Sequence, residues 1–463
     1  MTRRLLLIGL TGVTMAAGGE APTKARRAVE SARTVRPMPT QRIDLATALR
    51  LAGAANLDIQ IARERVAEAE ANELAAVEQF FPAFSPGAAY RRHEGNIQAV
   101  EGRILDAEKE QYTAGVTAEG QVQVGEAIFR TLAARQIRDA AKYAAGAQEQ
   151  GSVLEAALGY FELARTAAVT DVAGESVHIA EDYAGQIKQA AEAGLAFRGD
   201  VSRATTQTER NRLSLAQAQQ QERLAASHLS QVLHMDSTMA LIPAGGELVP
   251  LRVAGTEASL DTLVMESLSS RPELKQYAAQ LAAAKRNRQG ALYGPLIPTV
   301  NGQAFYGGLG GGIGNPGPQD FDQSSDYGAG VSWRIGPGGL FDFGRVRAND
   351  ARVRVGELEL EKTRDEVIRQ VVDGYTRVHS LGSQLGTARR ALAAAEETLK
   401  LARERREFGV GVVLEAIQSE QDLTRARTDY VSIVAEHNKA VYLLERARGA
   451  LQVGVEGKAK SLR

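Results

Sequence analysis

The sequence contains no cysteine among its 463 residues. This absence excludes disulfide bonds, thiolate metal sites and a lipid-modified N-terminal cysteine. Aromatic residues make up only 5% of the chain, which suits long, closely packed helices better than the core of a globular enzyme. The formal net charge is −1, so the basic excess that nucleic-acid-binding domains usually show is missing. The composition therefore favours a helical protein that does not bind nucleic acid.

Long apolar runs are also missing, because no later stretch approaches the roughly 20 apolar residues that a membrane-spanning helix needs. At the N-terminus, Arg3 and Arg4 precede the apolar run 5–13 and then small residues, which is the layout of a secretory signal peptide. We predict that residues 1–20 are this signal, with a short buried helix as the alternative, and that residues 21–42 form a mobile arm. The protein is therefore expected to be exported without a helical anchor.

Proline is absent after Pro337 and between Pro86 and Pro243. Because proline removes a helical hydrogen bond and clashes with the preceding turn, both runs permit long helices. Apolar spacing of three and four residues predicts helices over 43–79, 128–193 and 200–234, and again over 260–292, 340–408 and onward to about 451. In each half the two short helices together match the long one in length. We expect them to lie end to end beside it.

Four segments alternate polar and apolar residues, as half-exposed strands do. They are residues 83–91, 116–124, 298–307 and 327–335. Each has about the length of a tilted strand that spans a bilayer, although a small soluble sheet is the alternative. If the apolar side meets lipid, the side chains that face the lumen of a barrel are Thr117, Glu119, Gln121, Gln123, Asn301, Gln303 and Arg334.

Aromatic residues near these segments are candidates for the membrane girdles, namely Tyr90, Tyr306, Tyr327 and Trp333. Four strands cannot close a barrel, and open sheet edges cannot face lipid. If the strands cross a membrane, several chains must therefore share one barrel, and this argument does not choose their number.

The two halves of the chain correspond at four points in the same order. Residues 56–70 match 271–285, Phe80 matches Leu296, Ala127 matches Gly339, and Gly194 matches Gly409, at offsets of 212 to 216 residues. Such regular spacing indicates an internal duplication. We predict a first repeat over 43–235, a linker over 236–257, a second repeat over 258–452 and a tail over 453–463.

This plan resembles that of the TolC-like outer-membrane efflux protein family. The resemblance is carried by the duplicated order of helix, strand, strand, long helix and helix, by the L-F-D-F-G-R-V-R-A sequence that starts at Leu340, and by the two glycine-containing tips. It implies a mainly α protein with a membrane β-barrel portion. Three chains would build a 12-stranded barrel in the outer membrane of a Gram-negative-type cell and a long α-helical barrel in the periplasm.

The resemblance also implies a passive export duct in a tripartite efflux pump or type I secretion system. Its partners would be a periplasmic adaptor protein and an inner-membrane pump, and no cofactor is implied. The helical tips would dock the adaptor through Ala193, Gly194, Leu195, Phe408, Gly409 and Val410. The periplasmic gate would be lined by Glu415, Gln418 and Asp200, although Asp200 is equally well an ordinary acid at a helix N-terminus. The alternative function is a soluble periplasmic coiled-coil scaffold.

An enzymatic reading finds no support in the motifs. The glycine-rich run 307–318 has the spacing of a phosphate-binding loop but lacks the following Lys-Ser/Thr, so we interpret it as an outer loop between strands. The six histidines show no metal-binding spacing. We therefore predict no catalytic residue and no metal site.

Overall fold

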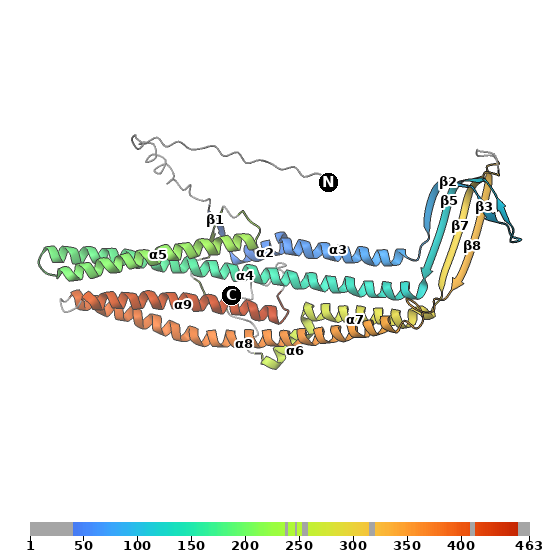
Figure 1. Cartoon of the computed structure of the whole chain (residues 1–463). Helices are drawn as coiled ribbons and strands as arrows, with labels where there is room; N and C mark the ends of the chain where they lie inside the picture. Colours follow the sequence, from blue (N-terminus) through green and yellow to red (C-terminus); the bar gives the residue numbers. More distant parts are fainter. Residues whose placement is uncertain are drawn as a thin grey trace, which may run out of the picture.

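The structure, a computed structural model, describes residues 40–236, 239–245, 248–251, 258–313, 320–407 and 413–451. These residues form a long rod of helices with a β-sheet at one end (Figure 1). The predicted signal peptide 1–20, nearly all of the predicted arm and the predicted tail 453–463 lie outside the described residues.

Two long helices run the length of the rod. The first, α4 (Val124–Glu192), has 69 residues, which corresponds to about 100 Å. In the first half, α3 (Leu57–Glu78) and α5 (Arg198–Val232) pack end to end along α4. In the second half, α7 (Pro272–Tyr293) and α9 (Val413–Ala447) pack in the same way along α8 (Phe343–Glu407). The predicted arrangement of two short helices beside one long helix is confirmed.

The first short helix of each half is interrupted, contrary to the prediction of continuous helices over 43–79 and 260–292. The first half has α2 (Leu45–Ala55) and then α3, separated by Asn56. The second half has α6 (Leu260–Ser270) and then α7, separated by Arg271. Both separating residues have nearly the same non-helical backbone, with φ and ψ of −67° and 125° at Asn56 and −59° and 123° at Arg271.

The sheet contains one pair of long strands from each half of the chain. The order is β2 (Ala83–His93), β5 (Lys109–Gln123), β7 (Thr299–Gly310) and β8 (Asp322–Ser332), and every neighbouring pair is antiparallel. The two central strands, β5 and β7, pair with each other and join the two halves. β2 and β8 are therefore the edge strands of the sheet.

The strand ends differ from the predicted ones because pairing extends them. β5 begins at Lys109 rather than residue 116, since it pairs with β2 as far as His93. β7 continues to Gly310, so the predicted outer loop does not begin at Gly307. β8 starts at Asp322 and ends at Ser332, three residues before the predicted end. A small hairpin of β3 (Asn96–Gln98) and β4 (Ile104–Asp106) extends from the end of the sheet that lies away from the helices.

The middle of the rod holds a further, unpredicted pair of strands. β1 (Thr40–Ile43), at the end of the predicted arm, runs parallel to β6 (Ala240–Pro243) in the predicted linker. Ile43 and Leu241 are buried there against the α4 and α5 side chains Leu163 and Leu229. The second half has its own cluster, which includes Leu263, Val371, Val441 and Leu444.

The remaining regular element is a short 3-10 helix, η2 (Gly294–Leu296), at the junction of helices and sheet. Its Gly294 lies so close to α4 that a Cβ atom on Gly125 would be 2.3 Å from the Gly294 carbonyl oxygen. Glycine is therefore needed at residue 125, whereas a Cβ atom on Gly294 would lie 3.4 Å from its nearest neighbour, which is an ordinary contact. In the part of the chain that the structure describes, no helix is both long enough and apolar enough to cross a membrane.

Candidate functional site

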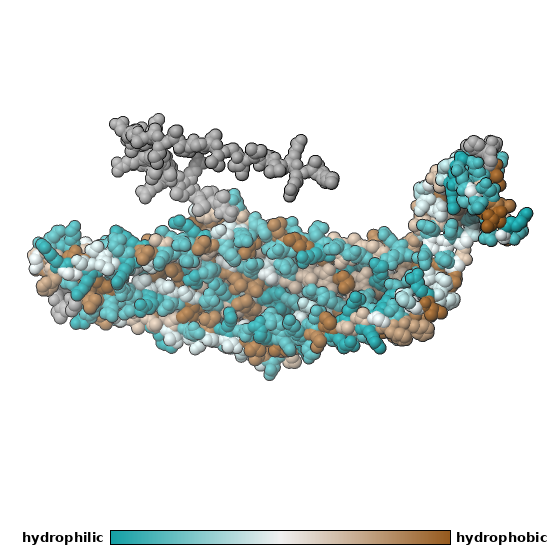
Figure 2. Space-filling model, viewed as in Figure 1, coloured by the Kyte–Doolittle hydropathy of each residue, from teal (hydrophilic) through white to brown (hydrophobic). Residues whose placement is uncertain are grey.

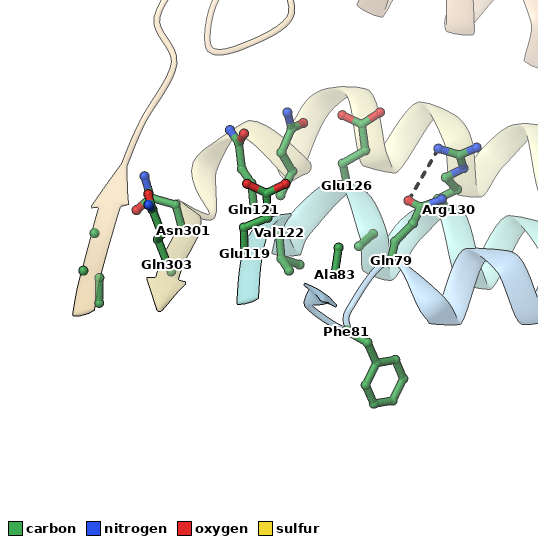
Figure 3. Close-up of a pocket in the computed structure, with 17 residues that line it drawn as sticks. Gln79, Phe81, Ala83, Glu119, Gln121, Val122, Glu126, Arg130, Asn301 and Gln303 are labelled. Carbon is green, nitrogen blue, oxygen red and sulfur yellow. Dashed lines mark hydrogen bonds between the residues drawn. The ribbon is translucent and has the colours of Figure 1, made fainter. Parts of the chain in front are cut away.

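The strand register brings the predicted lumen residues together on one side of the sheet. Glu119 pairs with Gln303 and Gln121 pairs with Asn301 across β5 and β7. Figure 3 shows these four side chains pointing to the same side. Directly paired residues lie on the same face of a sheet, and so does every second residue along a strand. We name the face that carries these four side chains the polar face. In β5 and β7 it comprises Thr113, Thr117, Glu119, Gln121, Gln123, Thr299, Asn301 and Gln303.

A hollow of about 1060 Å³ lies over the inner end of the polar face, where the sheet meets the helices. Glu126 and Arg130 of α4 continue its polar lining, and Arg130 donates a hydrogen bond to Gln79 at 3.4 Å (Figure 3). The polar surface is therefore continuous from the strands to the first turns of α4. This lining is polar and open to solvent, so it suits the passage of solutes and does not enclose a binding pocket.

Arg334 stands apart from the other six predicted lumen residues. It lies beyond the end of β8, and its carbonyl oxygen accepts a hydrogen bond from Leu340 N at 2.9 Å. The chain turns here through Gly336 and Gly338, whose φ values are +106° and +76°. Because Arg334 is not in a strand, alternation does not set the direction of its side chain, and its lumen position remains a prediction.

The opposite side of the sheet, which we name the apolar face, is covered by exposed apolar side chains. Paired residues such as Val116 and Tyr306, or Val300 and Val331, lie next to each other on it. The exposed fractions are high for side chains of this kind, at 44% for Val116, 60% for Tyr306 and 77% for Tyr327. A continuous apolar surface of this kind marks a contact with lipid or protein.

Two of the predicted girdle residues lie near opposite ends of this sheet. Tyr90 is close to the outer end of β2, and Trp333 follows the inner end of β8, where it donates to the Leu296 carbonyl at 3.3 Å. Tyr306 and Tyr327 lie within paired strands, so a girdle role for them remains a prediction. Tyr112, which the sequence reading missed, has its ring centroid 4.9 Å from that of Tyr90. Its place four residues before the alternating run 116–124 was the available signal.

The turn between α4 and α5 forms the first predicted docking tip. Gly194 has φ of +76°, and Leu195 N donates to the Ala190 carbonyl at 2.8 Å across it, which is a glycine-terminated helix end. Leu195 and Phe197 are 84% and 83% exposed at the end of the rod. Phe197 was not among the predicted residues.

The second predicted docking tip, Phe408, Gly409 and Val410, lies outside the described residues. It is the segment that connects α8 to α9, so the two ends it joins lie at the same end of the rod as the first tip (Figure 1).

The predicted gate residues do not form one cluster. Glu415, in the first turn of α9, pairs with Arg405 of α8 at 2.7 Å. Asp200, in the first turn of α5, pairs with Arg203 at 3.2 Å, as expected for an acid at a helix N-terminus. Gln418 is exposed on α9. A gate role for these three residues therefore remains a prediction.

A buried acid further along α9 was missed by the sequence reading. Glu420 lines a cavity of about 330 Å³ between α4, α5 and α9, together with Ser176, Asn211 and Thr424. Its Oε1 atom is buried without a hydrogen-bond partner among the described residues. Burial raises the pKa of Glu420 to about 7, with Arg403 opposing the shift and Glu175 adding to it. No local sequence feature signals this burial, because it depends on two other helices.

The contacts around Glu420 connect the two halves near the tips. Gln421 donates to Gln207 of α5 at 2.6 Å, and Arg427 pairs with Glu175 of α4 at 2.7 Å. The Tyr183 hydroxyl donates to the Val413 carbonyl at 3.3 Å. Polar contacts therefore hold the two halves together near the tips. Replacing such hydrogen bonds by hydrogen bonds with water costs less free energy than exposing an apolar core.

Comparison with known proteins defines the class. Residues 263–450 match the family model described as outer membrane efflux protein. Protein CyaE of Bordetella pertussis is 28% identical over 335 residues, which cover 69% of this chain and 66% of that relative, just under two thirds of its length.

Solved structures agree in fold along nearly the whole chain. The CmeC outer membrane channel of Campylobacter jejuni matches with a TM-score of 0.76 and 14% identity, covering 97% of this chain and 96% of CmeC. The outer membrane protein VceC of Vibrio cholerae matches with a TM-score of 0.73 and 17% identity, covering 88% of this chain and 96% of VceC. At these identities the likeness concerns the fold.

The match to the outer membrane efflux protein model lies in the second half of the chain, and the solved structures extend the likeness in fold to nearly the whole chain. The predicted resemblance to this family and the predicted mainly α fold with long helices and added strands are confirmed. The descriptions of these similar proteins agree with the predicted outer-membrane location and the predicted non-enzymatic nature, and both belong to the proposed function.

Proposed function

We propose that this chain is one of three identical subunits of a passive export channel that crosses the outer membrane and the periplasm. The observation that carries the proposal is the four-stranded sheet, which has one apolar face, one polar face and two free edges. An open sheet cannot stand in lipid, because the unpaired backbone groups of its edges would be desolvated. Several copies must therefore complete one barrel, and family resemblance supports three.

The helices extend the same passage. α4 and α8 begin directly beyond the strands and continue for about 100 Å, so a ring of copies encloses a tunnel as long as the rod. Hydrophobic residues lie among hydrophilic ones on the surface of the rod (Figure 2), and Leu213 and Leu224 of α5 and Leu358 of α8 are 56–67% exposed in the single chain. Their burial between neighbouring copies would stabilise the ring.

The cargo would enter at the helical tips. The exposed Leu195 and Phe197 at the α4–α5 turn offer an apolar surface for the tip of a periplasmic adaptor, which would connect the channel to an inner-membrane pump. The name of the CyaE relative does not identify the cargo of this chain. We infer that the pump selects the cargo and that the channel serves a tripartite efflux pump or a type I secretion system.

The experiment is to express the full chain, extract outer membranes with detergent and test for a heat-resistant trimer on gels, followed by conductance in planar bilayers. The expected result is a trimer with a stable, water-filled conductance. A monomer released in osmotic-shock fluid would contradict the proposal and favour the periplasmic scaffold. Replacing Glu119 by Lys should shift the ion selectivity towards anions, whereas Ala118→Ser on the apolar face should leave it unchanged.

A further inference from the structure

The two free edges of the sheet have matching lengths and opposite directions. β2 and β8 each contain 11 residues. Because all three pairings between them are antiparallel, β2 and β8 run in opposite directions within one chain. In a ring of copies, β8 of one copy therefore meets β2 of the next as an antiparallel pair. This geometry follows from the strand order alone and lets the ring close.

The same two edges carry opposite charges at the same end. On β2, Arg91 and His93 lie on the polar face at the end away from the helices. On β8, Asp322 and Asp326 lie on that face at the same end, since Asp322 pairs with Leu309 and Asp326 with Phe305. The cationic edge and the anionic edge are thus separated within one chain by two further strands.

Within the described part of the chain, these four side chains have no ion-pair partner. Among the described residues, neither Arg91 nor Asp326 forms an ion pair, and Asp322 accepts only a backbone hydrogen bond from Gln323 at 2.7 Å. The neighbouring Arg92, on the opposite face, differs because it pairs with Glu94, Glu108 and Glu110. The unpaired charges are therefore specific to the polar face of the edges.

We propose that the seam between neighbouring copies is closed and oriented by Arg91 and His93 of one copy against Asp322 and Asp326 of the next. This inference rests on the proposed shared barrel and adds its register. If the two 11-residue strands pair end to end, His93 lies opposite Asp322, Arg91 lies opposite Ser324, and Gly87 lies opposite Gly328. Arg91 then stands diagonally between the two aspartates, within reach of its long side chain.

The charge pattern also selects which edges meet. Antiparallel pairing of β2 with a second β2 would leave Arg91 opposite Ser85 without an acid, and the same pairing of two β8 strands would bring the two Asp326 side chains close together. Like charges in opposed strands destabilise a pairing, whereas opposite charges stabilise it. The edges therefore favour a head-to-tail contact, which closes into a ring, over a symmetric dimer.

The register can be tested by disulfide crosslinking, because the natural chain has no cysteine. A Cβ atom at Gly87 or at Gly328 meets no other atom within 4 Å, so Gly87→Cys and Gly328→Cys should both be accommodated. Oxidation of the double variant should give covalent dimers and trimers on denaturing gels. The control pair, Gly87→Cys with Ser332→Cys, is displaced by four residues, or about 13 Å, and should not crosslink.

The charges can be tested by reversal in the full-length trimer. Arg91→Asp and Asp326→Arg should each lower the heat-resistant trimer fraction, by roughly two- to fivefold for each seam that is weakened. The combined variant should recover it, and Arg103→Asp, on the β3–β4 hairpin away from the edges, should leave it unchanged.

The outcomes separate the two proposals. Trimers that form normally but crosslink only through the displaced pair, or charge reversals whose losses simply add, would overturn the seam and leave the channel intact. A natural chain that forms no trimer at all would overturn the proposed function and the seam with it.

Discussion

The two interruptions at Asn56 and Arg271 have the same backbone geometry and very different chemistry. Both residues are 3% exposed. Each contacts the C-terminal end of the last helix of its half, which is α5 for Asn56 and α9 for Arg271. The Asn56 amide donates to the Val232 carbonyl of α5 at 3.4 Å, and its oxygen accepts from Asp58 N at 2.8 Å. At the first interruption, a single neutral side chain therefore makes both of these hydrogen bonds to the backbone.

At the second interruption a charged side chain, that of Arg271, makes the corresponding contacts. Its guanidinium donates to the carbonyls of Arg446 and Ala447 at 3.0 and 3.3 Å, to Gln370 at 2.8 Å and to Glu273 at 3.0 Å. Burial lowers the pKa of Arg271, and Glu273 opposes that shift. The duplicated plan therefore determines the backbone, while each half stabilises it separately. The second half depends on one buried cation.

The largest expected effect comes from removing that cation. Arg271→Ala leaves the Arg446 and Ala447 carbonyls without this donor and removes one of the two arginine partners of Glu273, which keeps Arg446. Breaking a buried ion pair costs about 3–5 kcal/mol. The free energy of unfolding in denaturant would measure it. The matched control is Arg288→Ala on α7, whose ion pair with Asp350 at 2.5 Å is largely exposed and worth about 0–1 kcal/mol. Equal losses for the two variants would contradict the comparison.

A second contrast concerns pH, and it sets Glu162 of α4 against Glu420 of α9. The pKa of Glu420 is about 7 in the fold and 4.5 in the unfolded chain, so the fold binds the proton more tightly. Stability therefore falls as pH rises from about 4.5 to 7, and Glu420→Gln should remove that slope. Urea midpoints measured between pH 4 and 8 would show it.

Glu162 should give the opposite slope. Hydrogen bonds from Arg165, and then from Lys439, outweigh burial and lower the pKa of Glu162 to about 2. Its contribution is complete above pH 4.5 and is lost as pH falls towards 2. Glu162→Gln should therefore reduce acid sensitivity without changing the slope between pH 5 and 7. If both variants altered the same pH range, the assignment of the two carboxyls would be wrong.

The tip of the first half offers a smaller test. Gly194→Ala forces a Cβ atom into the left-handed backbone region at φ of +76°, at a cost of about 1–2 kcal/mol. Amide hydrogen exchange in the last turn of α4 should accelerate. Gly199→Ala is the matched control, because Gly199 is helical with open space around it, and alanine should stabilise α5 by up to about 1 kcal/mol. Equal exchange in both variants would count against strain at the turn.

The smallest effect is expected at the first interruption. Asn56→Ala removes one helix cap and one hydrogen bond to Val232, which together are worth about 1 kcal/mol. Denaturant unfolding under the conditions used for Arg271→Ala would compare the two directly. A loss at Asn56 as large as that at Arg271 would show that the two interruptions are energetically equivalent.

The elements themselves were largely predictable from local patterns. Alternation in 116–124 and 298–307 identified strands because side chains of a strand repeat every second residue. The absence of proline after Pro337 correctly indicated a long helix, now α8. The interruption at Asn56 was missed because the pattern is helical on both sides of it. Pro272 was an available signal for the interruption at Arg271, because the residue before a proline is disfavoured in a helix and proline suits the first turn of the next one.

The candidate site was predictable only in part. The side of the strand on which Glu119 and Gln121 lie followed from alternation, and the register then placed Asn301 and Gln303 beside them. The burial of Glu420 and the contact of Gln421 with Gln207 could not be predicted, since each depends on a helix more than 200 residues away. Docking and gate roles remain predictions.

The sequence by itself determined the kinds of element, their duplicated order and the two faces of each strand, because these features are encoded in spacings of two to four residues. Only the tertiary structure decided that β5 of the first half pairs with β7 of the second, leaving β2 and β8 as oppositely charged edges. Pairing and burial depend on which distant segments meet, and local periodicity carries no information on that choice.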